Sequence, residues 1–302
     1  MSTAPGVIAP SQQRSVEPVP VQSKGRRRRV NPGQIALITV LSVGLAATLL
    51  PFVWMILGAF KTNAEIMRRP VTWWPQAPTM KNFRAWFVDF DMSRYFFNSV
   101  FVAVVAVGTT LLFCSMVGWA LAKLDFPGKK ILITVVLSTM FVPGIVTLIP
   151  TFVLVANLGM VGTYWGLILP GMVGAFGVFL MRQFMLEIPD SLLDASRIDG
   201  AGEFRIFAQI VMPLCKAPLA TLAIFTFMGS WNGFLWPLIV TQRESMYTLP
   251  VALALYTSPT GDKGAEFGLQ MAGAVLIIVP VLALFIAMQK HFVQGIAMTG
   301  IK

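Results

Sequence analysis

The sequence predicts an all-α membrane protein with six transmembrane helices and a helical loop between the fourth helix and the fifth. Of its 302 residues, 56% are hydrophobic and only 12% are charged, which is about half the charged share of an average soluble domain. The hydrophobic residues gather in long runs, and a helix needs about 20 such residues to cross a bilayer. The composition therefore indicates a bundle of membrane-spanning helices.

The distribution of basic residues and cysteines excludes two other classes of protein. The net charge of +10 would suggest nucleic-acid binding in a soluble chain, but here Lys and Arg cluster at the edges of the apolar runs. No nucleic-acid partner is expected. Cys114 and Cys215 lie within or beside apolar runs and far apart in sequence, so neither a disulfide framework nor a metal site is indicated.

Residues 1–33 differ in composition from the rest of the chain. They are rich in Pro, Ser, Gln and Val and end in the basic run Arg26–Arg29, which predicts a disordered basic cytoplasmic tail. The apolar segment that follows, 34–60, is too long for the core of a cleavable signal peptide. It is predicted to be the first membrane span, and residues 34–302 to form one membrane domain.

The remaining spans follow from the lengths of the apolar runs. No charged residue occurs from Ile131 to Met181, a stretch too long for one span and suited to two spans joined by the turn at Asn157 to Thr163. Prolines occur inside several runs, and kinked helices are expected because neighbouring helices can satisfy the freed carbonyls. The later spans are predicted at 96–122, 131–155, 163–181, 218–240 and 269–288.

The positions of Lys and Arg predict the orientation in the inner membrane. With the amino terminus inside, most of the 23 basic residues fall in cytoplasmic segments, as the positive-inside rule requires. Both termini are therefore placed in the cytoplasm. The first external loop is the main exception to this rule, because it also contains basic residues. They are Lys61, Arg68, Arg69, Lys81, Arg84 and Arg94.

The loop over residues 187–214 combines charged residues with an apolar pattern that an exposed loop does not need. Pro189 can begin a helix, Asp190 places negative charge near its positive end, and Gly200 can end it with a positive φ. A second helix is expected from Gly202 to Pro213, leading into the fifth span. From these residues alone, a membrane-surface helix that docks no partner is an equal alternative.

This loop resembles the EAA loop of permease subunits in binding-protein-dependent ABC importers. Two further segments narrow the resemblance to the maltose-type carbohydrate permease family, and it covers about residues 35–302. The usual Glu-Ala-Ala of the loop is Asp194-Ala195-Ser196 here, so the acidic group has a shorter reach. The matching segments are Asp194–Gly202 followed by Ile210–Leu214 in the loop, Ala120–Lys129 before the third span, and Trp231–Leu238 in the fifth.

The resemblance implies a heterodimeric pore formed by this chain and a homologous second permease subunit. It also implies two cytoplasmic ATPase subunits, which bind ATP and magnesium, and an extracytoplasmic sugar-binding protein that largely selects the sugar. The loop would dock on an ATPase subunit as a coupling helix, with Leu192, Leu193 and Ile198 as apolar anchors and Asp194 or Asp199 facing basic groups. The coupling residues expected on this basis are Leu192, Leu193, Asp194, Ala195, Arg197, Ile198, Asp199, Gly200 and Gly202.

The chain itself carries no sign of catalysis or of a bound cofactor. It has a single histidine and lacks a G-x-x-x-x-G-K-[ST] phosphate loop, a G-x-S-x-G turn and an HExxH pair. The absence of a phosphate loop agrees with ATP hydrolysis on separate subunits. A non-catalytic membrane subunit is therefore expected.

Trp231 and Asn232 are the predicted substrate-path residues. An indole face can pack on a sugar ring, and an amide can both donate and accept hydrogen bonds, although both residue types also serve as helix-packing groups. An ion-coupled secondary transporter is one alternative function, but it usually has ionisable residues within its spans, and none of the six predicted spans contains a charged residue. A scaffold subunit without a pore is another alternative, but it does not need kinked, Pro-rich spans.

Overall fold

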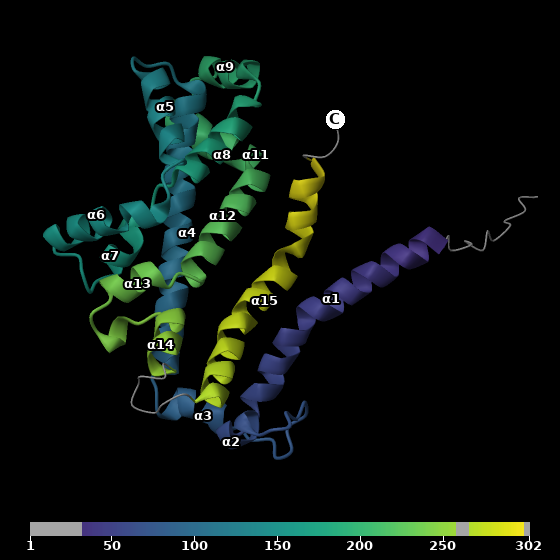
Figure 1. Ribbon diagram of the computed structural model, residues 1–302. Coiled ribbons are helices and arrows are strands. Elements are labelled where there is room, and N and C mark those ends of the chain that lie inside the picture. The colour runs from purple at the N-terminus through teal and green to yellow at the C-terminus, as the bar shows by residue number, and fades with distance from the viewer. Residues whose placement is uncertain (1–31, 258–265, 299–302) are drawn as a thin grey trace, which may run out of the picture. The chain divides into compact units, whose positions relative to one another are not determined.

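The computed structural model describes residues 32–257 and 266–298, and every regular element in these ranges is a helix (Figure 1). The chain divides into two compact units, residues 1–49 and residues 50–302. The described part of the first unit is the beginning of α1 (Pro32–Ala59). The predicted tail, including Arg26–Arg29, and the carboxyl-terminal Lys302 lie outside the described residues.

By length and composition, two of the described helices can cross a membrane as single spans. They are α1 and α4 (Met92–Lys123), and the number rises to five if each of three bent helix pairs counts as one span. The last predicted span lies within α15 (Phe267–Met298). A helical membrane protein is therefore confirmed in outline, whereas the count of six spans stays a prediction.

The predicted third span is not one straight helix. Residues 131–155 fall in α5 (Lys129–Thr139) and α6 (Gly144–Asn157), which meet at an angle of 108°. Pro143 lies at the break and has ψ 133°. It cannot donate a backbone hydrogen bond, and it disfavours helical backbone at the residue before it. The apolar run predicted a helical segment here and the prolines predicted a kink, but the size of the bend at Pro143 was not predicted.

The fourth and fifth predicted spans are also interrupted. Residues 163–181 comprise α7 (Tyr164–Ile168), the 3₁₀ turn η1 (Leu169–Gly171) and part of α8 (Ala175–Leu186), with a 45° bend. Residues 218–240 comprise α12 (Lys216–Trp231) and α13 (Leu235–Val240). Gly233 lies in the gap after α12, where an added Cβ would lie 3.1 Å from the Ser230 carbonyl oxygen. The tight turn there ends α12 nine residues before the predicted boundary.

The loop of residues 187–214 forms the two predicted helical parts. The first is α9 (Asp190–Ile198), and the second runs through α10 (Glu203–Ile206), the π-helix η2 (Phe207–Val211) and α11 (Met212–Leu214). This second part meets α12 at an angle of 82°. The other short helices of the chain are α2 (Asn63–Met67), α3 (Lys81–Val88), η3 (Glu244–Met246) and α14 (Leu249–Tyr256).

Helix α4 forms the centre of the second unit, and α8 and α12 pack along it. Close packing depends on Gly118 of α4, where an added Cβ would lie 2.9 Å from Cβ of Met181 in α8. One buried cluster, including Trp119 and Met185, lies at the end of α4 near α9. A second, including Tyr95 and Leu249, lies at its opposite end near α14. Helix α4 therefore links two separate ends of this unit (Figure 1).

Candidate functional site

Helix α9 has the boundaries that its sequence predicts. Pro189 occupies its N-cap position, Asp190 lies in its first turn and Arg197 in its last. Gly200, two residues after the last helical residue, has a φ of +82°. This left-handed backbone conformation favours glycine. The helix lies at one end of the second unit, beside α5 and α8 (Figure 1).

The apolar side chains of α9 do not all face outward, and this corrects one predicted role. Leu193 is only 1% exposed and packs in the cluster that contains Trp119 and Met185. It therefore fixes α9 to its own chain and cannot be an anchor for a partner. Leu192 is 42% exposed and Ile198 is 85% exposed. These two side chains, with the exposed Ala195, form the outer apolar surface of α9.

Arg197 connects α9 to the helix that follows it. Its guanidinium donates to a carboxylate oxygen of Asp194 at 2.8 Å and to one of Glu203 at 2.8 Å. The hydrogen bonds from Arg197 to Glu203 and then to Asp194 raise the pKa of this guanidinium. Gly202 is the N-cap of α10, with extended backbone. The bond between Arg197 and Glu203 therefore joins α9 to α10, and Asp194 holds the Arg197 side chain from within α9.

Asp199 is the predicted acidic residue that has no ion pair among the described residues. It follows the last residue of α9 as its C-cap and is exposed. Together with Ser196 and Arg205 it lines a shallow groove between α9 and α10. The Asp199 carboxylate can therefore pair with a basic group on a partner. The Asp194 carboxylate could do so only while it also pairs with Arg197.

Lys123 at the end of α4 connects this helix to the start of α9. Its side chain is almost fully buried, and its ammonium group donates to the Ile188 carbonyl at 2.6 Å and to the Asp190 carboxylate at 2.7 Å. The hydrogen bond from Lys123 lowers the pKa of Asp190. The sequence analysis did not identify this contact, because the partners are more than sixty residues apart. Lys123 therefore ties the end of α4 to the start of α9.

The opposite end of α4 is fixed by a second set of polar contacts. The Glu244 carboxylate accepts hydrogen bonds from the hydroxyls of Tyr95, at 2.8 Å, and Tyr256. The hydrogen bonds from Tyr256 and Tyr95 lower the pKa of Glu244. In addition, the Asn98 amide donates to the carbonyl oxygens of Ser245 and Tyr247, each at 2.9 Å. The beginning of α4 is therefore held against η3 and α14.

The two predicted substrate-path residues occupy different environments. Trp231 is 1% exposed, stacks on Phe227 and donates from Nε1 to the Ile277 carbonyl at 3.1 Å. It therefore packs α12 against α15 and does not face a cavity, contrary to its predicted role. Asn232 is exposed at the end of α12 and donates to the Met228 carbonyl at 3.0 Å. Only Asn232 retains a side chain that a substrate could reach.

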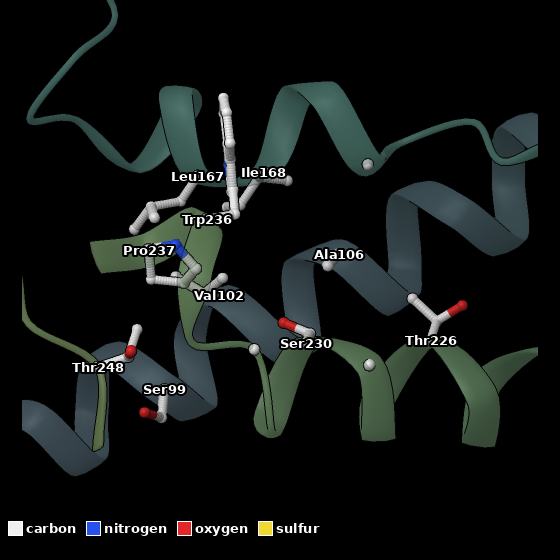
Figure 2. Close-up of a pocket in the computed structure, with 13 residues that line it drawn as sticks. Ser99, Val102, Ala106, Leu167, Ile168, Thr226, Ser230, Trp236, Pro237 and Thr248 are labelled. Atoms are coloured by element: carbon white, nitrogen blue, oxygen red, sulfur yellow. The ribbon is translucent and has the colours of Figure 1, made fainter. Parts of the chain in front are cut away.

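A cavity of about 250 Å³ is lined by Ser230, which precedes Trp231 in the sequence, and not by Trp231 itself (Figure 2). It is bounded by α4, by α7 with η1, by α12 with α13, and by the residue before α14. Four hydroxyl side chains line it, namely Ser99, Thr226, Ser230 and Thr248, together with an apolar wall that includes Trp236 and Leu167. Sequence analysis missed these residues. The available signal was the pair Thr226 and Ser230, which are four residues apart and so share one face of a helix.

Comparison with known proteins identifies the family. The sequence profile of the binding-protein-dependent transport system inner membrane component matches residues 114–298. The chain belongs to this family. The match covers the end of α4, the α9 loop and every later helix, so the elements described above are those of an inner-membrane component of a binding-protein-dependent transport system.

Relatives are similar to this transport component over nearly its full length. The arabinooligosaccharides transport system permease protein AraQ of Halalkalibacterium halodurans is 38% identical over 283 residues, covering 91% of this chain and 99% of that protein. The lactose transport system permease protein LacG of Rhizobium radiobacter is 34% identical, covering 89% and 96%. The sn-glycerol-3-phosphate permease protein UgpE of Brucella abortus is 32% identical, covering 86% and 94%.

A solved structure has the same fold. A chain in the crystal structure of a bacterial ABC transporter involved in import of the acidic polysaccharide alginate superimposes with a TM-score of 0.78. It is 24% identical in sequence, and the alignment covers 88% of the present chain and 98% of that one. The two chains therefore share their overall fold.

Proposed function

We propose that this chain is a pore-forming permease subunit of an ATP-driven importer for a saccharide or a related polyol or glycoside. The observation that carries the proposal is the similarity to relatives whose names describe permeases for arabinooligosaccharides, lactose and sn-glycerol 3-phosphate. The uncharged, hydroxyl-lined cavity supports it. The complex would contain a homologous second permease, two ATPase subunits that bind ATP and magnesium, and an extracytoplasmic binding protein.

Helix α9 is the proposed coupling helix. Its outer surface, formed by Leu192, Ala195 and Ile198 with Asp199 beside them, would dock in a groove on an ATPase subunit. The other predicted residues have positioning roles in this proposal. Leu193 attaches the helix to its own chain, and Arg197, held by Asp194, joins it to α10 through Glu203. Gly200 and Gly202 shape the connection.

Alternating access would follow from the connection between α9 and α4. When the ATPase subunits close on ATP, they would draw α9 inward, and Lys123 would transmit this movement to α4. This is a rigid-body transition, in which packed elements move as units. The docking of α9 can shift the equilibrium between inward and outward states only by its difference in binding free energy between them.

Reconstitution of the purified complex in proteoliposomes tests the proposed function. With its binding protein outside and ATP inside, we expect uptake of at least one of lactose, arabinobiose and sn-glycerol 3-phosphate, and no uptake without ATP. Uptake that needs an ion gradient and no ATP would instead establish a secondary transporter. Failure of ATPase subunits to copurify, with no uptake under either condition, would indicate a scaffold subunit.

We also propose that both termini are cytoplasmic, as the distribution of Lys and Arg suggests. Single cysteines in the 1–33 tail and near Lys302 should not react with a membrane-impermeant maleimide added to spheroplasts. Trp74→Cys, at an exposed position between α2 and α3, is the matched control and should react. Cys114 and Cys215 are buried and should contribute little background. Reaction at either terminus without permeabilisation would contradict this topology.

A further inference from the structure

The hydroxyl of Thr248 has no hydrogen-bond partner among the described residues, although Thr248 is only 3% exposed. Thr248 is the N-cap of α14, a position where a threonine side chain normally accepts from a backbone N–H of the first turn. It makes no such bond. Instead, the N–H of Leu249 donates to Oγ of Ser99 at 2.8 Å. Within the described part of the chain, the Thr248 hydroxyl is therefore unused by the fold, and Thr248 is one of the residues that line the cavity.

Two half-buried hydroxyls of α12 also have no hydrogen-bond partner among the described residues. Serine and threonine in helices often bond to the carbonyl four residues earlier, as Thr221 does to Ala217 at 3.1 Å. No comparable bond is found for Thr226 or Ser230 within the described part of the chain. Both side chains line the cavity on one face of α12, with Gly229 and Gly233 beside them (Figure 2). Their donors and acceptors are therefore free to bind a guest.

Ser99 completes the set from α4. Its hydroxyl oxygen accepts the Leu249 N–H, and a hydroxyl that accepts one bond still has its own proton to donate. Four residues with hydroxyl side chains, from three separate parts of the chain, thus line one cavity. The hydroxyls of Thr226, Ser230 and Thr248 have no hydrogen-bond partner among the described residues, whereas polar groups inside a protein are normally paired, so the set points to a polyhydroxylated guest.

The size and charge of the cavity define the guest further. Its volume of about 250 Å³ is several times the roughly 30 Å³ that a water molecule occupies in the liquid, and it is slightly below the range of about 300 to 1,000 Å³ for drug-sized ligands. No Asp, Glu, Lys, Arg or His lines it. An uncharged cavity with one apolar side suits a single neutral sugar ring, whereas a phosphate group would have no cation to bind there.

We propose that this cavity binds one neutral sugar ring of the transported saccharide. Thr226, Ser230 and Thr248, with the proton of Ser99, bond its hydroxyl groups, and the wall that includes Trp236 and Leu167 covers its apolar face. This proposal rests on the proposed function of a saccharide importer. It adds that this subunit holds part of the substrate itself, and that the cavity selects neutral rings over phosphorylated polyols.

Protection of a cavity cysteine tests binding directly. Ala106 lines the cavity without contributing a hydroxyl, so Ala106→Cys in the purified complex reports occupancy through its reaction with a small methanethiosulfonate reagent. Lactose and arabinobiose, at millimolar concentration, are the neutral probes, and sn-glycerol 3-phosphate is the charged comparator. We expect at least one neutral sugar to slow the reaction and sn-glycerol 3-phosphate to leave it unchanged. Protection by the phosphate alone, or by none of the three, would overturn the proposal.

Thr248→Val separates ligand binding from folding. Because the hydroxyl has no protein partner, its replacement by a methyl group should not lower the melting temperature of the complex. Loss of one hydrogen bond to the sugar should weaken the protection of Ala106→Cys by about 3- to 10-fold. Thr241→Val is the matched control, since the Thr241 hydroxyl donates to the Pro237 carbonyl at 2.7 Å. It should lower the melting temperature and leave protection unchanged. Equal protection in Thr248→Val and wild type would contradict the proposed role of Thr248.

Filling the cavity gives an independent readout through transport. At Gly229 an added Cβ meets no atom within 4 Å, so Gly229→Leu can occupy the cavity without a backbone clash. We expect it to reduce sugar uptake in proteoliposomes at least 10-fold. Gly108→Leu, which is equally unobstructed on α4 and does not line the cavity, should retain uptake. Wild-type uptake in Gly229→Leu would refute the subsite alone, whereas absence of ATP-dependent uptake in the unaltered complex would refute the proposed function.

Discussion

Replacement of Gly200 by valine is expected to leave the subunit in the membrane while disconnecting ATP hydrolysis from transport. Gly200 has a φ of +82°, where a β-branched residue is strained by about 1 to 3 kcal/mol. No atom lies within 4 Å of an added Cβ, so the effect comes from the backbone and not from a clash. The strain equals typical coupling energies of about 1 to 3 kcal/mol between sites. The purified complex should lose ATPase subunits or hydrolyse ATP without sugar uptake.

Two further variants show whether backbone conformation is the cause. Gly200→Asn should retain more uptake than Gly200→Val, because asparagine tolerates the left-handed region better. Asp194→Ala should have a milder effect, since Arg197 keeps its bond to Glu203 and exposed ion pairs contribute only about 0 to 1 kcal/mol. Wild-type subunit stoichiometry, ATP hydrolysis and uptake in Gly200→Val would show that this loop does not couple the two processes.

Gly118→Ala is expected to destabilise the subunit itself. The new methyl group would lie 2.9 Å from Cβ of Met181 and 3.1 Å from the backbone nitrogen of Arg182, so α4 and α8 would have to separate. Overpacking of this kind costs about 1 to 3 kcal/mol. Thermal unfolding of the purified complex should show a lower melting temperature than wild type, with less subunit recovered from the membrane.

Gly108→Ala is the control for this second variant. It lies on the same helix, and no described atom comes within 4 Å of an added Cβ. The two variants thus make the same chemical change in α4 with and without a neighbour. If both had the melting temperature of wild type, α4 and α8 would be able to separate at no cost, and the close packing at Gly118 would not determine stability.

The features that the sequence predicted correctly depend on local rules. Pro189 begins α9 and Gly200 follows its end with positive φ, because capping preferences act within a few residues. The helical segments of the membrane domain were likewise found from runs of apolar residues. Kinks were expected from the prolines, but their size was not, since the same apolar count describes a slightly kinked span and two helices that meet at 108° at Pro143.

The predicted roles that the structure corrects, those of Leu193 and Trp231, depend on the direction in which a side chain points. Leu192 and Leu193 are adjacent and identical in type, yet one is exposed and the other is buried, and only the packing of α9 on α4 and α8 decides which. Trp231 satisfies both its apolar surface and its N–H inside the bundle, so composition alone could not assign it to packing or to substrate. The cavity hydroxyls became visible only when α4, α12 and the start of α14 were placed together.

The attachment of α4 at both ends has a mechanical consequence. Lys123 fastens one end to the start of α9, and Tyr95 fastens the other to Glu244. These residues are 28 positions apart on a single unbroken helix, a length of about 42 Å at 1.5 Å per residue. A displacement of one end of α4 along its axis would therefore also move the other end. The neighbouring α12 is interrupted at both of its ends, by the 82° bend at Cys215 and by the break at Gly233, so we expect changes of angle between α4 and its neighbours to occur at these two breaks.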